Sequence, residues 1–237
     1  LYLCLNGKTL ASNGTAKIQV KNGGRLVLCD CRGGGTFKGA TQSVWGGACI
    51  YLYTSTLDMF GGKLTGGKVT GKGGGGAIAL DDQQCIFNMY GGEISGNRAN
   101  SEGGAVHVFD KDCQFFLYDG KITGNTSGDG GAIYLNQEPS WLIMQGGEIS
   151  GNTATGNGGG VYIYRTGSVC QLYGGKIENN KASGNGGGIY INPSNSGQLR
   201  VGNKPLVQNN TASGKANNVY LPSGKTLSIS APMEPGA

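Results

Sequence analysis

The stretch from Gly146 to Ile163 reads GGEISGNTATGNGGGVYI, and close variants of it recur along the chain. In most copies an isoleucine stands two residues after the double glycine, an asparagine comes three residues later, and a second glycine cluster leads into a short apolar strand. The asparagines stand 27 to 30 residues apart, at Asn97, Asn125, Asn152, Asn180 and Asn210. The residues that open the apolar strand keep nearly the same step, at Ile78, Val106, Ile133, Val161, Ile189 and Val219. Two independent markers with one period establish an internal repeat.

A repeat of about 28 residues that holds three short strands predicts a solenoid. A propeller blade needs about 40 residues, and a leucine-rich repeat needs leucines at fixed positions. Three strands per turn, stacked turn on turn, are typical of a parallel β-helix. We therefore predict an all-β, right-handed parallel β-helix of seven to eight coils, in one domain over residues 1–237. Residues 1–57 would form irregular first coils, 58–221 the regular repeats, and 222–237 a closing strand and tail.

The composition excludes several other classes of protein. Glycine accounts for 48 of 237 residues, but only 6 prolines are present and glycine does not recur at every third position, so collagen is excluded. Glycine costs about 1 kcal/mol in a helix interior, which argues against a helical protein. The net charge is +5 and the basic residues are scattered, so we expect no nucleic-acid partner. No apolar stretch approaches the ~18 residues of a membrane span, so we expect no membrane insertion.

The repeat predicts which residues face the core and which form the turns. The aliphatic rows would stack inside the helix, coil upon coil. The asparagines would form a structural ladder, since asparagine tolerates left-handed backbone and stacked amides can hydrogen-bond between coils. After the double glycine the charge alternates, at Lys63, Glu93, Lys121, Glu148 and Lys176. This alternation places opposite charges on neighbouring coils.

Two columns of aromatic residues are expected to point outward. The first contains His107 and the tyrosines Tyr134, Tyr162, Tyr190 and Tyr220; the second, just before the double glycine, contains Phe60, Tyr90, Tyr118, Gln145 and Tyr173. Tyrosine is favoured in strands, so both columns could serve packing alone. Exposed aromatic faces also stack on sugar rings, and for this reason we predict that Tyr134, Tyr162, Tyr190 and Tyr220 form a ligand-binding surface.

A catalytic role is the weaker alternative. Asp81, Asp82 and Asp110 follow equivalent strands of adjacent coils, and His107 lies on the same strand as Asp110. Paired carboxylates of this kind could act in glycoside hydrolysis or hold calcium as in pectin-cleaving β-helices. The loops around them are short and would build no cleft, so we expect no enzyme activity.

The seven cysteines form no CxxC pair, which disfavours structural zinc, and we expect no metal or cofactor. Cys85 and Cys113 occupy one slot in successive coils and could form a disulfide or a stack of free thiols. Cys4 and Cys29 could be in contact in the first coils.

The repeated unit resembles the β-helix repeats of large bacterial cell-surface proteins, especially those of gut Firmicutes. The GGAI tetrapeptides, at residues 75–78 and 130–133, are also similar to the repeats of chlamydial polymorphic outer-membrane autotransporters. These resemblances imply a pectate-lyase-like fold, secretion, and a role in adhesion or display. They transfer no catalytic residues, because a fold does not fix a function.

We therefore expect a non-catalytic domain of a larger bacterial protein, secreted or attached to the cell wall. Its partner would be a glycan or a host-surface protein, besides the flanking domains of its own polypeptide. A polysaccharide lyase or glycoside hydrolase that uses Asp82 and Asp110 is one alternative. A passive spacer or filament unit is the other.

Overall fold

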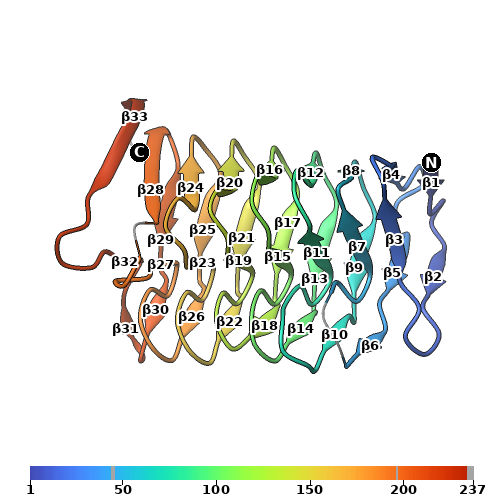
Figure 1. Ribbon diagram of the computed structural model, residues 1–237, viewed down its shortest axis with the longest axis horizontal. Coiled ribbons are helices and arrows are strands. Elements are labelled where there is room, and N and C mark those ends of the chain that lie inside the picture. The colour runs from blue at the N-terminus through green and yellow to red at the C-terminus, as the bar shows by residue number, and fades with distance from the viewer. Residues whose placement is uncertain (44–45, 196, 234–237) are drawn as a thin grey trace.

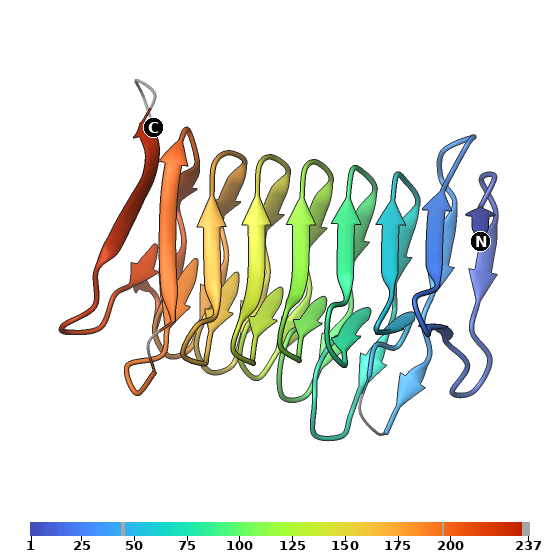
Figure 2. The same cartoon turned by 45° about the horizontal axis from the view of Figure 1, so that its top comes forward.

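The computed structural model describes residues 1–43, 46–195 and 197–233, and these form a solenoid of stacked β-strands (Figure 1). Four sheets run along its length, one of nine strands and three of eight, and no helix occurs in the described residues. The two termini lie at opposite ends of the stack, as Figure 2 also shows. The predicted all-β coil architecture is confirmed.

Sheets I and II contain the first two strands of each coil. Sheet I consists of β1 (Tyr2–Cys4), β4 (Arg25–Cys29), β8 (Thr56–Met59), β12 (Ile86–Met89), β16 (Cys113–Leu117), β20 (Ser140–Met144), β24 (Val169–Leu172), β28 (Gln198–Asn203) and β33 (Leu227–Met233). Sheet II consists of β2 (Thr9–Ala11), β5 (Thr36–Lys38), β9 (Lys63–Thr65), β13 (Glu93–Ser95), β17 (Lys121–Thr123), β21 (Glu148–Ser150), β25 (Lys176–Glu178) and β29 (Leu206–Gln208). The double glycines form the corner between them.

Sheets III and IV complete the coil. Sheet III consists of β6 (Thr41–Gln42), β10 (Lys68–Val69), β14 (Arg98–Ala99), β18 (Thr126–Ser127), β22 (Thr153–Ala154), β26 (Lys181–Ala182), β30 (Thr211–Ala212) and β31 (Lys215–Ala216). Sheet IV consists of β3 (Ile18–Lys21), β7 (Ile50–Tyr53), β11 (Ile78–Asp81), β15 (Val106–Val108), β19 (Ile133–Leu135), β23 (Val161–Ile163), β27 (Ile189–Ile191) and β32 (Val219–Tyr220). The three strands predicted for each coil lie in sheets I, II and IV.

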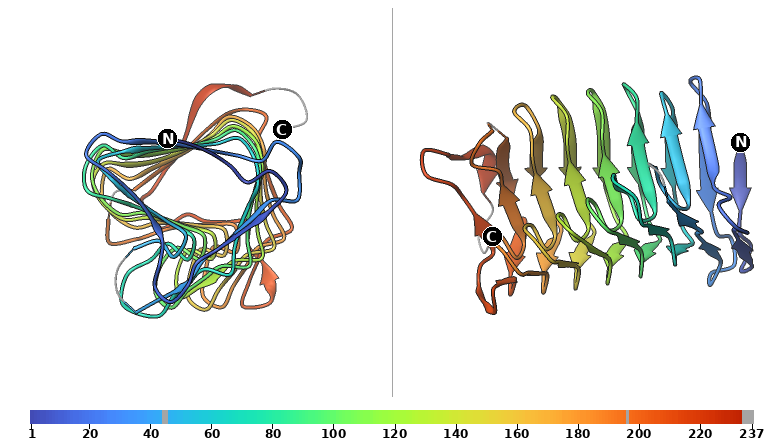
Figure 3. Two further views of the ribbon diagram at one scale, coloured as in Figure 1. Left: turned by 90° about the vertical axis from the view of Figure 1, so that its right-hand side faces the viewer. Right: turned by 60° about the horizontal axis from the view of Figure 1, so that its bottom comes forward.

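Sheet III adds a fourth strand that the sequence pattern did not predict. Its strands have two residues each, too few to show an alternation of apolar and polar side chains. Viewed down the long axis, successive coils superpose, and sheet III lies in a smaller lobe beside the main ring (Figure 3).

The pairing register stacks like residues along the core. In sheet II, Ile94 pairs with Leu64 on one side and Ile122 on the other. In sheet IV, Val106 pairs with Ile78 and Ile133. Residues of these rows inside the stack are 0–1% exposed, whereas Val219 and Leu221 in the last coil are 36% and 42% exposed. A row is therefore buried only where a further coil covers it.

The asparagines form a continuous hydrogen-bonded ladder at the corner between sheets II and III. The side-chain oxygen of Asn125 accepts from both the backbone N–H and the side-chain amide of Asn97, at 3.0 Å each. The Asn125 amide donates in turn to the Ile94 carbonyl at 2.9 Å and to Asn152. All five asparagines are at most 1% exposed, so these bonds satisfy polar groups that water cannot reach.

Two details of the ladder differ from the sequence prediction. The residue with positive φ is the one before each asparagine, such as Gly124 (φ 62°) or Asn179 (φ 57°), and not the ladder asparagine itself. The ladder also has a sixth member: Asn218 accepts from the Asn210 backbone at 3.0 Å, where no further coil supplies an asparagine. The repeat period does not identify Asn218 as a ladder residue, because it lies only eight residues after Asn210.

Candidate binding groove

The first aromatic column, predicted to be an exposed ligand-binding surface, is largely buried. Tyr134, Tyr162 and Tyr190 are 3%, 6% and 8% exposed, and only Tyr220, in the last coil, is partly accessible. The ring centroids of successive tyrosines lie 4.8, 4.8 and 5.0 Å apart; the Tyr134–Tyr162 and Tyr190–Tyr220 pairs are stacked, and the Tyr162–Tyr190 pair is tilted by 43°. The side chains do leave the outer face of sheet IV as predicted, but the expectation that they are exposed was wrong.

Burial of this column comes from the glycine-rich loops between sheets III and IV. Each loop passes so close to the column that a Cβ added at Gly158 would lie 3.0 Å from Tyr162 Cβ, and one at Gly130 would lie 3.2 Å from Tyr134 Cβ. The sheet III lobe thus closes over the outer face of sheet IV. The burial raises the pKa of Tyr134 and of Tyr162 above the ordinary value for tyrosine. These phenols are part of a second, aromatic core.

The second aromatic column is the exposed one. Phe60 and Tyr90 are 53% and 39% exposed, and Tyr118 is half-buried. The rings of Phe60 and Tyr90 stack at 4.7 Å and those of Tyr90 and Tyr118 at 4.8 Å. Since the rings cover each other's faces, this column presents its ring edges and phenol groups to solvent. It therefore cannot act as a row of open ring faces for sugars.

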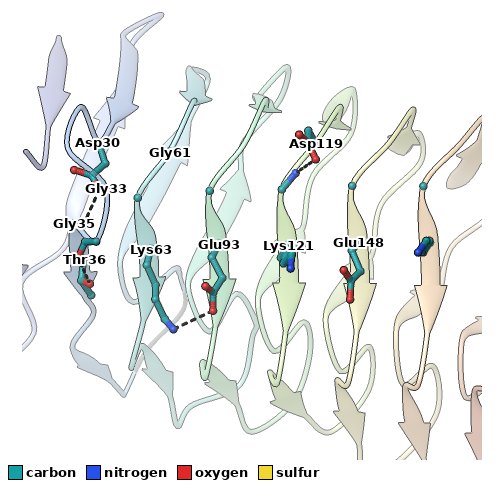
Figure 4. Close-up of a pocket in the computed structure, with 17 residues that line it drawn as sticks. Asp30, Gly33, Gly35, Thr36, Gly61, Lys63, Glu93, Asp119, Lys121 and Glu148 are labelled. Atoms are coloured by element: carbon teal, nitrogen blue, oxygen red, sulfur yellow. Dashed lines mark hydrogen bonds and ion pairs between the residues drawn. The ribbon is translucent and has the colours of Figure 1, made fainter. Parts of the chain in front are cut away.

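A groove of about 790 Å³ runs along the molecule beside this column, at the corner between sheets I and II. It is lined by the double glycines and by the first residue of successive sheet II strands, namely Asp30, residues 33–36, Gly61, Gly62, Lys63, Gly92, Glu93, Asp119, Gly120, Lys121, Gly147, Glu148, Gly175 and Lys176. Figure 4 shows the charged side chains on consecutive rungs along one side. From Lys63 to Lys176 the groove crosses five rungs, about 19 Å at ~4.8 Å per strand.

The groove has small floor residues because coils approach closely at this corner. A Cβ added at Gly146 would lie 2.2 Å from the Tyr118 carbonyl oxygen, and one at Gly92 would lie 2.7 Å from the Gly62 oxygen. Gly61 differs, because a Cβ there would lie 3.5 Å from its nearest neighbour, the Asp30 nitrogen, and its φ is not in the left-handed region. Gly61 is therefore a position at which a side chain can be added to the groove without backbone strain.

The wall of the groove alternates in charge, as the sequence predicts. Lys63 and Glu93 form an ion pair at 2.9 Å, with 41% and 36% of their side chains exposed (Figure 4). The pKa of Glu93 is lowered, first by a hydrogen bond from Ser95 and then by Lys63. Since the rungs alternate between ammonium and carboxylate groups, the wall offers hydrogen-bond donors and acceptors in turn.

Each of the three carboxylates of the predicted catalytic set accepts a hydrogen bond from a nearby residue. Asp81 accepts a hydrogen bond from the Tyr51 phenol, Asp82 accepts one from Thr54 at 2.7 Å, and Asp110 accepts the N–H of the adjacent Lys111 at 2.7 Å. None of these carboxylates lines the groove. Each is instead engaged in local turn or cross-coil contacts.

His107, the fourth of these residues, lies in the buried tyrosine column. It is 1% exposed and packs edge-on against Tyr134 at 5.3 Å. Its Nε2 atom has no hydrogen-bond partner and lies 3.6 Å from Glu102 Oε2. Burial lowers the His107 pKa to about 3 and raises the pKa of Glu102. His107 is therefore neutral near pH 7. Sequence reasoning missed Glu102, which follows Asn100 and Ser101 in an ordinary polar loop.

The seven cysteines form two groups: four buried free thiols and a cluster of three in the first coils. Cys49, Cys85, Cys113 and Cys170 are buried free thiols, so the Cys85–Cys113 slot holds stacked thiols and not a disulfide. Cys4 is paired with Cys29 in the register of β1 and β4, but its disulfide partner is Cys31. Within the described residues, the three sulfurs of Cys4, Cys29 and Cys31 are the group of ligand atoms close enough to hold a metal ion.

Three segments of the chain match a family model described as the Chlamydia polymorphic membrane protein repeat, over residues 120–136, 147–164 and 176–192. Each matched segment begins at or beside the glycine corner, includes a ladder asparagine and ends one residue after a sheet IV strand. The match covers a minority of the chain and indicates a β-helix repeat protein similar to those membrane proteins. No curated protein and no solved structure matches the chain. Across the described ranges, no helix is long and apolar enough to cross a membrane.

Proposed function

We propose that this chain is a rigid, non-catalytic domain displayed on a bacterial surface, and that it binds an extended neutral glycan along the groove between sheets I and II. The groove itself carries the proposal: it is continuous over at least five coils and is lined by residues that the repeat places at one position in every coil. A ligand that lies along it meets equivalent positions of the repeat at each step, with the charge of the wall alternating from rung to rung. A linear polymer fits such a surface better than a compact small molecule.

The display role rests on the repeat. Segments of three coils match the Chlamydia polymorphic membrane protein repeat, which is described as a repeat of membrane proteins. A solenoid with short turns also suits display, because each coil contacts its neighbours and extends the rod in one direction. Secretion or attachment to a bacterial cell wall, and adhesion to a host surface, follow from this likeness as parts of the proposal.

The charge pattern of the groove favours a neutral ligand. A polyanion would gain from Lys63, Lys121 and Lys176 but would be repelled by Glu93 and Glu148 on the rungs between them, and a polycation would meet the reverse pattern. Sugar hydroxyls both donate and accept, so they can use ammonium and carboxylate groups in turn.

A glycan array tests the proposal, with detection of released sugar in parallel. We expect retention of one or more neutral linear glycans without release of fragments. Lys121→Glu would place three carboxylates on consecutive rungs and should weaken binding at least about tenfold. Lys68→Glu is the matched control, because Lys68 is exposed on β10 and does not line the groove.

Each contrary outcome favours a different function. Release of sugar that is lost in Asp82→Asn or Asp110→Asn would favour the polysaccharide-active enzyme. Absence of binding to every glycan and host surface tested would favour a passive spacer or filament unit. Retention that Lys121→Glu and Lys68→Glu reduce equally would place the binding surface outside the groove.

A further inference from the structure

The first coils bring together three sulfur atoms that the groove does not use. Cys4 ends β1, Cys29 ends β4 on the neighbouring rung, and Cys31 follows two residues later. Their sulfur atoms all lie within 4.8 Å of one another. Cys31 is exposed and Cys29 is partly accessible, so solvent reaches this group.

The local backbone holds this arrangement in place. The carboxylate of Asp30, the residue between Cys29 and Cys31, accepts the N–H groups of Gly7 and Gly35 at 2.6 Å each. These bonds fix the turn that returns Cys31 toward Cys4. The Cys31 backbone N–H also points at the Cys4 sulfur, at 3.2 Å. A hydrogen bond of this kind stabilises negative charge on a sulfur.

We propose that Cys4, Cys29 and Cys31, when reduced, bind a thiolate-preferring divalent cation of the Zn²⁺ type. Zinc–sulfur bonds of about 2.3 Å place the sulfurs of a tetrahedral site about 3.8 Å apart. Reduction lets the bonded Cys4 and Cys31 sulfurs separate to this spacing, and the Cys29 sulfur already lies within 4.8 Å of both. Three thiolates leave the fourth position to water or an added ligand. As the sulfur–metal bonds form, each thiol gives its proton to solvent.

The disulfide between Cys4 and Cys31 and the metal ion compete for the same sulfurs. A phosphine reductant and one water molecule convert the disulfide into two thiols and a phosphine oxide, after which all three cysteines can act as ligands. The other four cysteines do not compete for the ion, because they are buried. Burial raises the pKa of Cys49 and of Cys170 to about 12, which keeps these thiols protonated. The proposed site therefore has a stoichiometry of one ion per chain.

The sequence search for CxxC pairs could not find this site. Two ligands are separated by a single residue, and the third comes from the preceding coil, 27 residues before Cys31. The pairing of β1 with β4 supplies the third ligand, and only the coil register places it there.

The test uses the full chain, reduced with a phosphine and transferred to anaerobic buffer. Titration with Cd²⁺, followed by its ultraviolet thiolate charge-transfer absorption, and with Zn²⁺ against a chromophoric chelator, should each saturate at one ion per chain. Cys29→Ser keeps the Cys4–Cys31 pair and should weaken Zn²⁺ binding at least about 100-fold. Cys170→Ala removes a buried thiol and should leave it unchanged.

A second measurement needs no variant. Zn²⁺ should slow the alkylation of Cys4, Cys29 and Cys31 by iodoacetamide in the reduced parent, as read by peptide mass spectrometry. The proposal is overturned if no saturable binding occurs, if Cys29→Ser binds Zn²⁺ as tightly as the parent, or if Zn²⁺ leaves the alkylation of these three cysteines unchanged.

Discussion

The two aromatic columns have the same sequence period but opposite surroundings. The column of Tyr134, Tyr162 and Tyr190 is at most 8% exposed, whereas Phe60 and Tyr90 in the other column are 53% and 39% exposed. In both columns the rings stack on their equivalents one coil away, at 4.7–5.0 Å. The difference in exposure comes from what lies next to each column. The sheet III lobe covers the first column, whereas an open groove borders the second. A repeating aromatic position thus predicts stacking, but it does not predict exposure.

The largest effect should come from removing one ring of the buried column. Tyr162→Ala leaves a cavity between Tyr134, Tyr190 and the covering loop, and we expect it to lower the free energy of unfolding by about 3 kcal/mol. Tyr90→Ala, in the exposed column, loses mainly stacking contacts and should cost about 1 kcal/mol. Urea denaturation of both variants measures the contrast. Equal losses would show that the two columns are buried alike.

The buried column therefore gives no clean binding test by alanine substitution. A double variant with Tyr162→Ala and Tyr190→Ala should be strongly destabilised, so any loss of ligand would reflect loss of the fold. Phenylalanine keeps the ring, and Tyr162→Phe removes only a phenol that accepts a weak 3.4 Å bond from Asn192.

The asparagine ladder lies between the two columns along each coil, and breaking it should have the next largest effect. Asn152→Ala removes the acceptor of the Asn125 backbone N–H, at 3.0 Å, and the donor to the Ile122 carbonyl, at 2.9 Å. These groups remain buried without partners, so we expect a loss of about 2–3 kcal/mol. Thermal denaturation of Asn152→Ala beside Asn157→Ala, in the neighbouring loop, provides the comparison. A loss in Asn152→Ala no larger than in Asn157→Ala would contradict a stabilising ladder.

His107 occupies the place of a tyrosine in the buried column and should make stability depend on pH. Its pKa is about 3 when folded, against 6.5 for the free side chain, so the unfolded chain binds its proton more readily. Stability should therefore fall as the pH drops from about 6.5 toward 3. Glu102 and Asp129, whose pKa values burial raises, act in the opposite direction. His107→Tyr introduces the residue that Tyr134 provides at this position in the next coil, and it should lose less stability over this range than the parent. Identical pH profiles would contradict the assigned state of His107.

The smallest effect on stability should come from a substitution in the groove wall, beside the exposed column. Glu93→Gln breaks the ion pair with Lys63, which is accessible to solvent, and should cost less than about 1 kcal/mol at low salt. The cost should shrink further in high salt because the charges are screened. A loss of several kcal/mol, unchanged by salt, would show that the groove wall is structural.

The sequence predicts the coil well and the surface poorly, for one physical reason. Core rows such as Ile94 and Val106 repeat because every coil buries the same face, and this periodicity is visible in the chain itself. Exposure of Tyr162, the engagement of Asp82 by Thr54, and the meeting of Cys4 with Cys31 depend on how loops and coils lie beside one another. The two-residue strands of sheet III, which form the covering lobe, carry no periodic signal of their own.

The affinity of the parent and two variants for an array-selected glycan is the most direct test of the groove as the binding surface. Gly61→Leu adds a side chain to the groove where the backbone accepts one, and Tyr162→Phe alters the buried column while keeping its ring. We predict that Gly61→Leu raises Kd at least about tenfold, or 1.4 kcal/mol, while Tyr162→Phe leaves Kd unchanged. An unchanged Kd in Gly61→Leu together with weaker binding in Tyr162→Phe would contradict the account.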